Sequence, residues 1–83
     1  MSIYELLDKE LRKTGNIEVL DYTEYDEDYL CSIDLYDIGK EGEEAFFEEV
    51  DSLIKKLKEN YTIEDKRWYE DSEHKAEARI WIR

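Results

Sequence analysis

Hydrophobic residues recur along the chain with two periods, which predict two helices and four strands. In residues 2–14, "SIYELLDKELRKT", apolar side chains fall three and four positions apart, as on one face of a helix. Ser2 and Glu5 fit a capping box at its start, and Gly15 ends it. A second helix is predicted after Gly42. Its wide apolar face is formed by Phe46, Phe47, Val50, Leu53, Ile54 and Leu57.

Alternation with a period of two predicts four strands, at residues 17–23, 29–38, 61–70 and 75–83. The acidic segment Glu24–Asp28 forms the turn of the first hairpin, and "DSEH" at 71–74 forms the turn of the second. The apolar positions change parity between Ile63 and Trp68, which predicts a β-bulge in the third strand. The order α-β-β-α-β-β predicts a single α+β domain over residues 1–83, with a four-stranded, mainly antiparallel sheet and both helices on one face.

The two faces of this sheet are expected to differ in chemistry. In the second strand, the apolar face holds Cys31, Ile33 and Leu35, and the outer face holds Ser32, Asp34 and Tyr36. Tyr22 is expected to join the outer face from the neighbouring strand. In the last strand, alternation leaves Trp81 pointing outward beside Arg79 and Arg83. Trp81 either pairs with Trp68 across the strands or contacts a second copy or another partner.

Charge is concentrated in one part of the chain. The 83 residues include 24 acidic and 12 basic ones, for a net charge of −12. Residues 18–49 contain 13 acids and a single base, Lys40, whereas the segments on either side are each neutral. The dipole of the second helix explains part of this pattern, because its glutamates crowd its start and its lysines crowd its end. An acidic turn that only keeps the protein soluble would explain another part.

Neither explanation covers the acids in or beside the paired strands, since like charges that face each other destabilise a sheet. Alternate residues on one strand face stand roughly 6.7 Å apart, which is similar to the spacing of successive phosphates along a nucleic-acid backbone. Tyrosine rings among these acids can stack under arginine guanidinium groups. We therefore expect a basic, nucleic-acid-binding protein as partner and no direct binding of nucleic acid, because phosphates would be repelled. The expected partner-binding residues are Asp21, Tyr22, Glu24, Tyr25, Asp26, Glu27, Asp28, Asp34, Tyr36, Asp37, Glu41, Glu43 and Glu44.

The acidic segments "DYTEYDEDY", "DLYD" and "EGEEAFFEE" cover about a third of the chain. A small, acidic, cysteine-poor domain with its charge on one hairpin and an adjoining helix resembles the phage-encoded nucleic-acid mimics. Within that class it looks most like the small anti-CRISPR inhibitors, with the anti-restriction mimics as neighbours. The resemblance implies a Cas effector or another nuclease as the target, and it carries over no individual residue.

Other chemistries find less support in the sequence. The segment "DEDYLCSIDLYD" lacks the glycine and the terminal glutamate of a calcium loop, and His74 falls in a predicted turn. Cys31 lies on an apolar strand face with no base nearby to activate a thiol. We expect no catalytic residues, no metal and no cofactor. The chain has no apolar run of the ~20 residues that a membrane span needs. With its single cysteine, a cytoplasmic location is expected, that of a host cell if a phage encodes the chain.

The expected function is that of a non-enzymatic inhibitor, a DNA or RNA mimic that occupies a basic surface of its target. An immunity protein or antitoxin that caps a basic nuclease toxin would use the same electrostatics. An acidic adaptor subunit, whose charge only aids solubility, is a third alternative. A homodimer is compatible with each of the three.

Overall fold

The computed structural model describes residues 2–69 and 75–83, and it contains two helices and four strands in the predicted order. The helices are α1 (Ile3–Leu11) and α2 (Glu43–Leu57). The strands are β1 (Ile17–Glu24), β2 (Cys31–Asp37), β3 (Ile63–Tyr69) and β4 (Ala76–Ile82). The predicted α+β class with a four-stranded antiparallel sheet is confirmed. The predicted turn at 71–74, with His74, lies outside the described residues.

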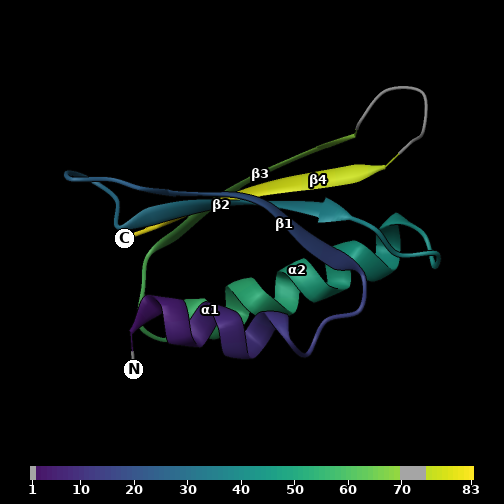
Figure 1. The fold of residues 1–83 in the computed structure, drawn as a ribbon, viewed down its shortest axis with the longest axis horizontal. Helices are drawn as coiled ribbons and strands as arrows, with labels where there is room; N and C mark the ends of the chain where they lie inside the picture. Colours follow the sequence, from purple (N-terminus) through teal and green to yellow (C-terminus); the bar gives the residue numbers. More distant parts are fainter. Residues whose placement is uncertain (1, 70–74) are drawn as a thin grey trace.

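The sheet has the strand order β1-β2-β4-β3, so that each hairpin contributes one central strand and one edge strand. Both helices lie against the same face of the sheet (Figure 1), as predicted. We call this face the inner face and the opposite one the outer face. Within the described residues, the outer face is covered by no helix (Figure 1).

The core lies between the two helices and the central strands. Phe46, on α2, has no exposed surface, and Leu7, on α1, is 4% exposed. From the inner face of β2 and β4, the core receives Cys31, Ile33, Leu35, Ala76, Ala78, Ile80 and Ile82. These residues alternate with polar ones along each strand, so the period of two in the sequence directly produces the buried face.

Helix α1 is shorter than the sequence predicts, but it begins with the predicted cap. The Glu5 backbone N–H donates to Ser2 Oγ at 3.2 Å, which satisfies one of the free donors of the first turn. The helix ends at Leu11, three residues before the predicted end, because Thr14 folds back on it. Both the backbone N–H and the hydroxyl of Thr14 donate to the Leu11 carbonyl, at 3.1 and 2.7 Å.

Helix α2 begins after Gly42, whose φ of 94° lies in the left-handed region that favours glycine. Gly42 contributes no side-chain cap, and the first turn instead carries Glu43 and Glu44. The last turn carries Lys55 and Lys56. Negative charge at the start and positive charge at the end complement the helix dipole, as the sequence predicts.

The predicted β-bulge is in a different strand. The pairing of β3 with β4 is unbroken from Ile63 to Tyr69, so the bulge predicted in β3 is wrong. The apolar positions of β3 change parity because Trp68 lies on the outer face, opposite Glu77, and not because an extra residue is inserted. The bulge instead lies in β1 between Val19 and Asp21, where Leu20 is the extra residue. It reverses the parity of β1, so that Asp21 turns to the outer face and the next residue turns to the inner face.

Candidate acidic interface

The tip of the first hairpin presents three consecutive acids, Asp26, Glu27 and Asp28, all exposed. The tip is closed by backbone hydrogen bonds, from the Tyr25 N–H to the Leu30 carbonyl at 3.2 Å and from the Tyr29 N–H to the Glu27 carbonyl at 2.5 Å. Asp28 adopts a φ of 56°, a left-handed conformation that aspartate tolerates better than most residues do. Within the described residues, none of the three carboxylates forms an ion pair.

Two tyrosines fix this tip to the rest of the sheet. The Tyr25 hydroxyl lies 2.9 Å from Ser32 Oγ, and the ring of Tyr25 meets that of Tyr29 edge-on at 6.1 Å. The Tyr29 hydroxyl donates to Glu64 at 2.7 Å, and this hydrogen bond raises the pKa of Tyr29. The Arg83 guanidinium lies 5.2 Å from the centre of the Tyr29 ring. The tip carboxylates are therefore held on an anchored turn, as a preformed binding surface requires.

Further acids continue from the tip along the outer edge of the sheet. Glu18, Asp21 and Glu24 lie on edge strand β1 and are exposed. An eight-residue strand is about 26 Å long, at about 3.3 Å per residue.

At the far end of β1, contacts with both α2 and the turn that precedes it hold the residues before the strand. Glu49 accepts the backbone N–H groups of Gly15 and Asn16, each at 2.8 Å. The Asn16 carbonyl in turn accepts the Ile38 N–H at 3.0 Å. The exposed acids around the start of α2 thus continue the line of acids on β1. We call the whole set the acidic strip, which consists of Glu18, Asp21, Glu24, Asp26, Glu27, Asp28, Glu41, Glu43 and Glu44.

Two of the sequence-predicted acids do not belong to this strip, because the fold buries them. Asp34 is 8% exposed and accepts two hydrogen bonds from the Arg79 guanidinium, at 2.5 and 2.7 Å. These charge-assisted hydrogen bonds raise the pKa of Arg79. Asp37 is 2% exposed and accepts the backbone N–H of Gly39 at 2.9 Å, which shapes the turn that leads to α2. Neither carboxylate is presented to a partner as a free charge.

Tyr22 lies on the inner face, and its predicted place on the outer face is wrong. Its Cα is paired with core residue Ile33, and its ring lies 5.0 Å from that of Tyr4 on α1. Burial and a hydrogen bond with Cys31 raise the pKa of Tyr22 to about 12. The bulge at Leu20 causes this placement, because an unbroken β1 would point Tyr22 outward. Tyr36 does lie on the outer face, half-buried between Glu18 and Glu77.

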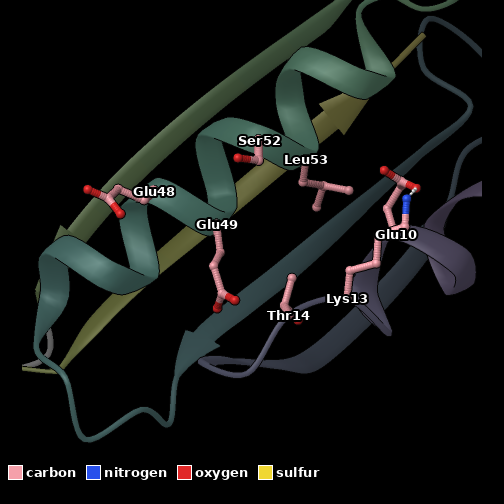
Figure 2. A pocket seen from close by; sticks show the side chains of 7 residues that line it. All are labelled: Glu10, Lys13, Thr14, Glu48, Glu49, Ser52 and Leu53. Carbon is pink, nitrogen blue, oxygen red and sulfur yellow. Dashed lines mark hydrogen bonds and ion pairs between the residues drawn. The ribbon is translucent and has the colours of Figure 1, made fainter.

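A groove of about 360 Å³ lies between the end of α1 and the side of α2 (Figure 2). It is lined by Glu10, Lys13, Thr14, Glu48, Glu49, Ser52 and Leu53. Its lysine is paired with Glu10 at 2.8 Å, and this contact lowers the pKa of Glu10. Glu49 is held by the two backbone groups described above. Three of the four ionic side chains of the groove, those of Glu10, Lys13 and Glu49, thus have partners within the protein.

The Cys31 thiol has no exposed surface, and burial raises its pKa. Among the residues that the structure describes, no group of three or more His, Cys, Asp or Glu side chains is placed to hold a metal ion. In the same residues, no helix is long and apolar enough to cross a membrane.

Sequence reasoning did not foresee that Arg79 neutralises Asp34, since the two are 45 positions apart. It included Glu18 in the acidic region but not among the binding residues, although this residue lies on the strip. In comparisons with known proteins, no family model, curated protein or solved structure matches the chain. Any function therefore has to rest on the charge and geometry of the molecule itself.

Proposed function

We propose that the protein is a non-enzymatic inhibitor that uses the acidic strip to bind the basic, nucleic-acid-binding surface of another protein. One observation carries this proposal. The exposed acids of the strip lie around the start of α2, along edge strand β1 and on the hairpin tip, and within the described residues none of their carboxylates has a cationic partner. Such a line of like charges opposes folding, and binding to a basic surface would remove the repulsion.

The dimensions of the strip support a mimic of a nucleic-acid backbone. Its section on β1, from Glu18 to Glu24, extends about 20 Å, and Glu18 and Asp21 lie opposite β2 residues that are about 6.7 Å apart. A strip of this kind would follow a row of arginines and lysines that normally contacts phosphates. It would also accelerate association with such a surface, at a rate that falls as salt is added. The same charge disfavours direct binding to DNA or RNA.

The proposal is tested by affinity capture from bacterial lysates that express Cas effectors and other nucleases. Immobilised wild type is compared with the variant Asp26→Asn/Glu27→Gln/Asp28→Asn, in which the tip is neutral but nearly unchanged in shape. A matched control, Glu5→Gln/Asp8→Asn/Glu59→Gln, removes the same charge from exposed positions outside the strip. We expect wild type and the control to retain a nucleic-acid enzyme that competing DNA displaces. We expect the tip variant to bind it at least about tenfold more weakly, as the loss of about 1.4 kcal/mol implies.

Equal capture by the wild type and the tip variant would contradict a role of the tip in binding. An immunity protein would be recognised by the identity of what is captured, a nuclease toxin rather than a defence effector. An acidic adaptor predicts that the tip variant differs from wild type only in solubility.

A further inference from the structure

The outer face of the sheet has a regular charge pattern, of which the proposed function uses only Glu18 and Asp21 at the β1 edge. The strand register aligns its side chains in three rows that cross the sheet in the order β1-β2-β4-β3. The middle row reads Asp21, Asp34, Arg79, Lys66. The row nearer the start of β1 reads Glu18, Tyr36, Glu77, Trp68. The row nearer the hairpin tip reads Thr23, Ser32, Trp81, Glu64.

The middle row places two acids on one half of the sheet and two bases on the other half. Asp34 and Arg79 satisfy each other at the centre. Asp21 and Lys66, at the two edges, form no ion pair within the described residues. Each of them also faces a residue of its own charge, an arrangement that destabilises a sheet. Within one protomer, and among the described residues, the two end residues of the row therefore lack a partner of opposite charge.

Both tryptophans of the chain lie on this face. Trp68 and Trp81 are half-buried and, with Lys66 and Arg79, line a shallow hollow of about 450 Å³. The Arg79 guanidinium lies 5.9 Å from the centre of the Trp81 ring. Tryptophan and arginine are the residues most enriched where protein surfaces bind each other tightly. An open sheet face with two indoles is therefore better suited to contact with protein than to contact with water.

A second copy of the chain complements this face in one orientation. Two sheets that pack face to face keep their strands roughly aligned, about 10 Å apart. A two-fold axis parallel to the strands and midway between the sheets places each row over itself with its order reversed. Asp21 then faces the partner's Lys66, and Asp34 faces the partner's Arg79. The row of acid, acid, base and base is its own complement under this operation.

The two outer rows complement themselves under the same operation. Glu18 faces the indole of the partner's Trp68, and Tyr36 faces the partner's Glu77. Thr23 faces the partner's Glu64, and Ser32 faces the partner's Trp81. In every case a carboxylate meets a hydrogen-bond donor, or a hydroxyl meets an indole, and no two like charges meet.

The in-plane two-fold axis that is perpendicular to the strands and crosses the middle row is disfavoured by charge. It would place Asp21, Asp34, Arg79 and Lys66 each over its own copy. Four like-charge contacts would result in the middle row, and like charges that face each other across an interface are strongly unfavourable. The charge pattern therefore favours the axis parallel to the strands over this perpendicular one.

We propose that the outer face forms a two-fold symmetric homodimer interface, in which Lys66 of one protomer pairs with the partner's Asp21. The interface shares Glu18 and Asp21 with the acidic strip, whereas the hairpin tip and the start of α2 lie outside the three rows and remain accessible. The dimer mass and the capture through the tip are separate readouts, so each proposal can fail without the other. The net charge of −12 opposes association. At physiological salt, however, charges further apart than about 8 Å are largely screened, so contacts within the interface dominate.

The test is a charge-swap experiment read by sedimentation equilibrium, at chain concentrations up to about 1 mM. Wild type is expected at twice the chain mass of 10.1 kDa. Asp21→Lys and Lys66→Glu each create two like-charge contacts in the dimer and should weaken it at least tenfold. The double variant Asp21→Lys/Lys66→Glu restores both pairs and should dimerise again. An equimolar mixture of the two single variants should also dimerise, since their heterodimer contains only opposite-charge pairs.

Two matched controls carry the same changes of charge outside the interface. Glu41→Lys and Lys58→Glu should leave the dimer mass unchanged. Circular dichroism shows whether each variant is folded, so that a monomer is not confused with an unfolded chain. A monomeric wild type over the whole concentration range would overturn the proposal. So would a dimer that persists in both single variants, or a mixture of the two that remains monomeric.

Discussion

Asp34 and Asp26 carry the same charge, but the fold gives them opposite surroundings. Asp34 is nearly buried and held by two hydrogen bonds from Arg79, whereas Asp26 is exposed on a turn. Removal of one partner of a buried ion pair destabilises the fold, because it leaves the other charge unpaired. An exposed acid on a turn contributes little to the fold and remains available to a partner. The function of each carboxylate is thus decided by its burial more than by its position in an acidic segment.

Among the described residues, Phe46 has the largest fully buried side chain, and it lies in the core. We expect Phe46→Ala to lower the free energy of unfolding by about 3–5 kcal/mol, because it removes buried apolar surface and leaves a cavity. Denaturant-induced unfolding measures the change. The control is Phe47→Ala, at a partly buried position that packs at the edge of the core, for which a smaller loss is expected. An unchanged midpoint for Phe46→Ala would contradict its place in the core.

Tyr22 predicts a dependence of stability on alkaline pH. Its pKa is raised to about 12 in the fold, chiefly by burial, from the ordinary value of 10.0. A raised pKa stabilises the fold fully below the unfolded value, and this contribution is lost as the pH rises through the folded value. The loss should therefore occur between about pH 10 and about pH 12. Titrations of wild type and Tyr22→Phe, followed by tyrosinate absorbance, should differ by one tyrosine that ionises near pH 12. A difference centred near pH 10 would show that Tyr22 ionises normally.

At the scale of the elements, Glu49 joins α2 to the turn between α1 and β1. Its two carboxylate oxygens accept the N–H groups of Gly15 and Asn16, each at 2.8 Å. Hydrogen bonds to a charged group contribute about 1.5–3 kcal/mol each when shielded, so Glu49→Ala should destabilise by about 1–2 kcal/mol at this partly exposed site. The adjacent and exposed Glu48 is the matched control, since its removal should change stability by less than about 0.5 kcal/mol. Equal losses of stability in chemical denaturation for the two substitutions would show that the hydrogen bonds of Glu49 do not stabilise the fold.

The elements themselves were predictable because each one repeats its pattern several times. Six apolar residues at helical spacing define α2, and four alternating ones define β4. The bulge in β1 was not predictable in this way, because Leu20 is apolar like its neighbour Val19 and gives no sign that it is the extra residue. The error moved Tyr22 to the wrong face. In β3, Trp68 gave a false sign of a bulge because a large apolar side chain on an open sheet face breaks the expected alternation.

The candidate site was predictable in composition but not in shape. The segment of residues 18–49 contains every carboxylate of the strip, and this follows from counting charges. That the start of α2 meets the start of β1 depends on a contact between Glu49 and Asn16, which are 33 positions apart. The rows of the outer face depend on the pairing of β2 with β4, which brings together two separate hairpins. Sequence periodicity specifies neither contact, because each one joins elements that are distant in the chain.

At the scale of the whole molecule, the carboxylates of the acidic strip repel one another over a distance that depends on the salt concentration. The molecule is 36 Å long, and the β1 section of the strip extends about 20 Å of this length. At about 10 mM salt the Debye length is about 30 Å, so acids at both ends of the strip repel each other. At about 150 mM salt it is about 8 Å, and only adjacent acids interact strongly.

We therefore expect wild type to become more stable as salt rises from about 10 to about 150 mM, by about 1 kcal/mol or about 4–8 °C in Tm. The variant Asp26→Asn/Glu27→Gln/Asp28→Asn should start from a higher Tm at low salt and gain less, because its tip no longer contributes repulsion. Thermal unfolding is measured at low chain concentration, since association would itself raise the Tm. An equal gain in wild type and variant would locate the repulsion outside the tip. In that case the repulsion that a basic partner would remove lies among the acids of β1 and of the start of α2, rather than at the tip.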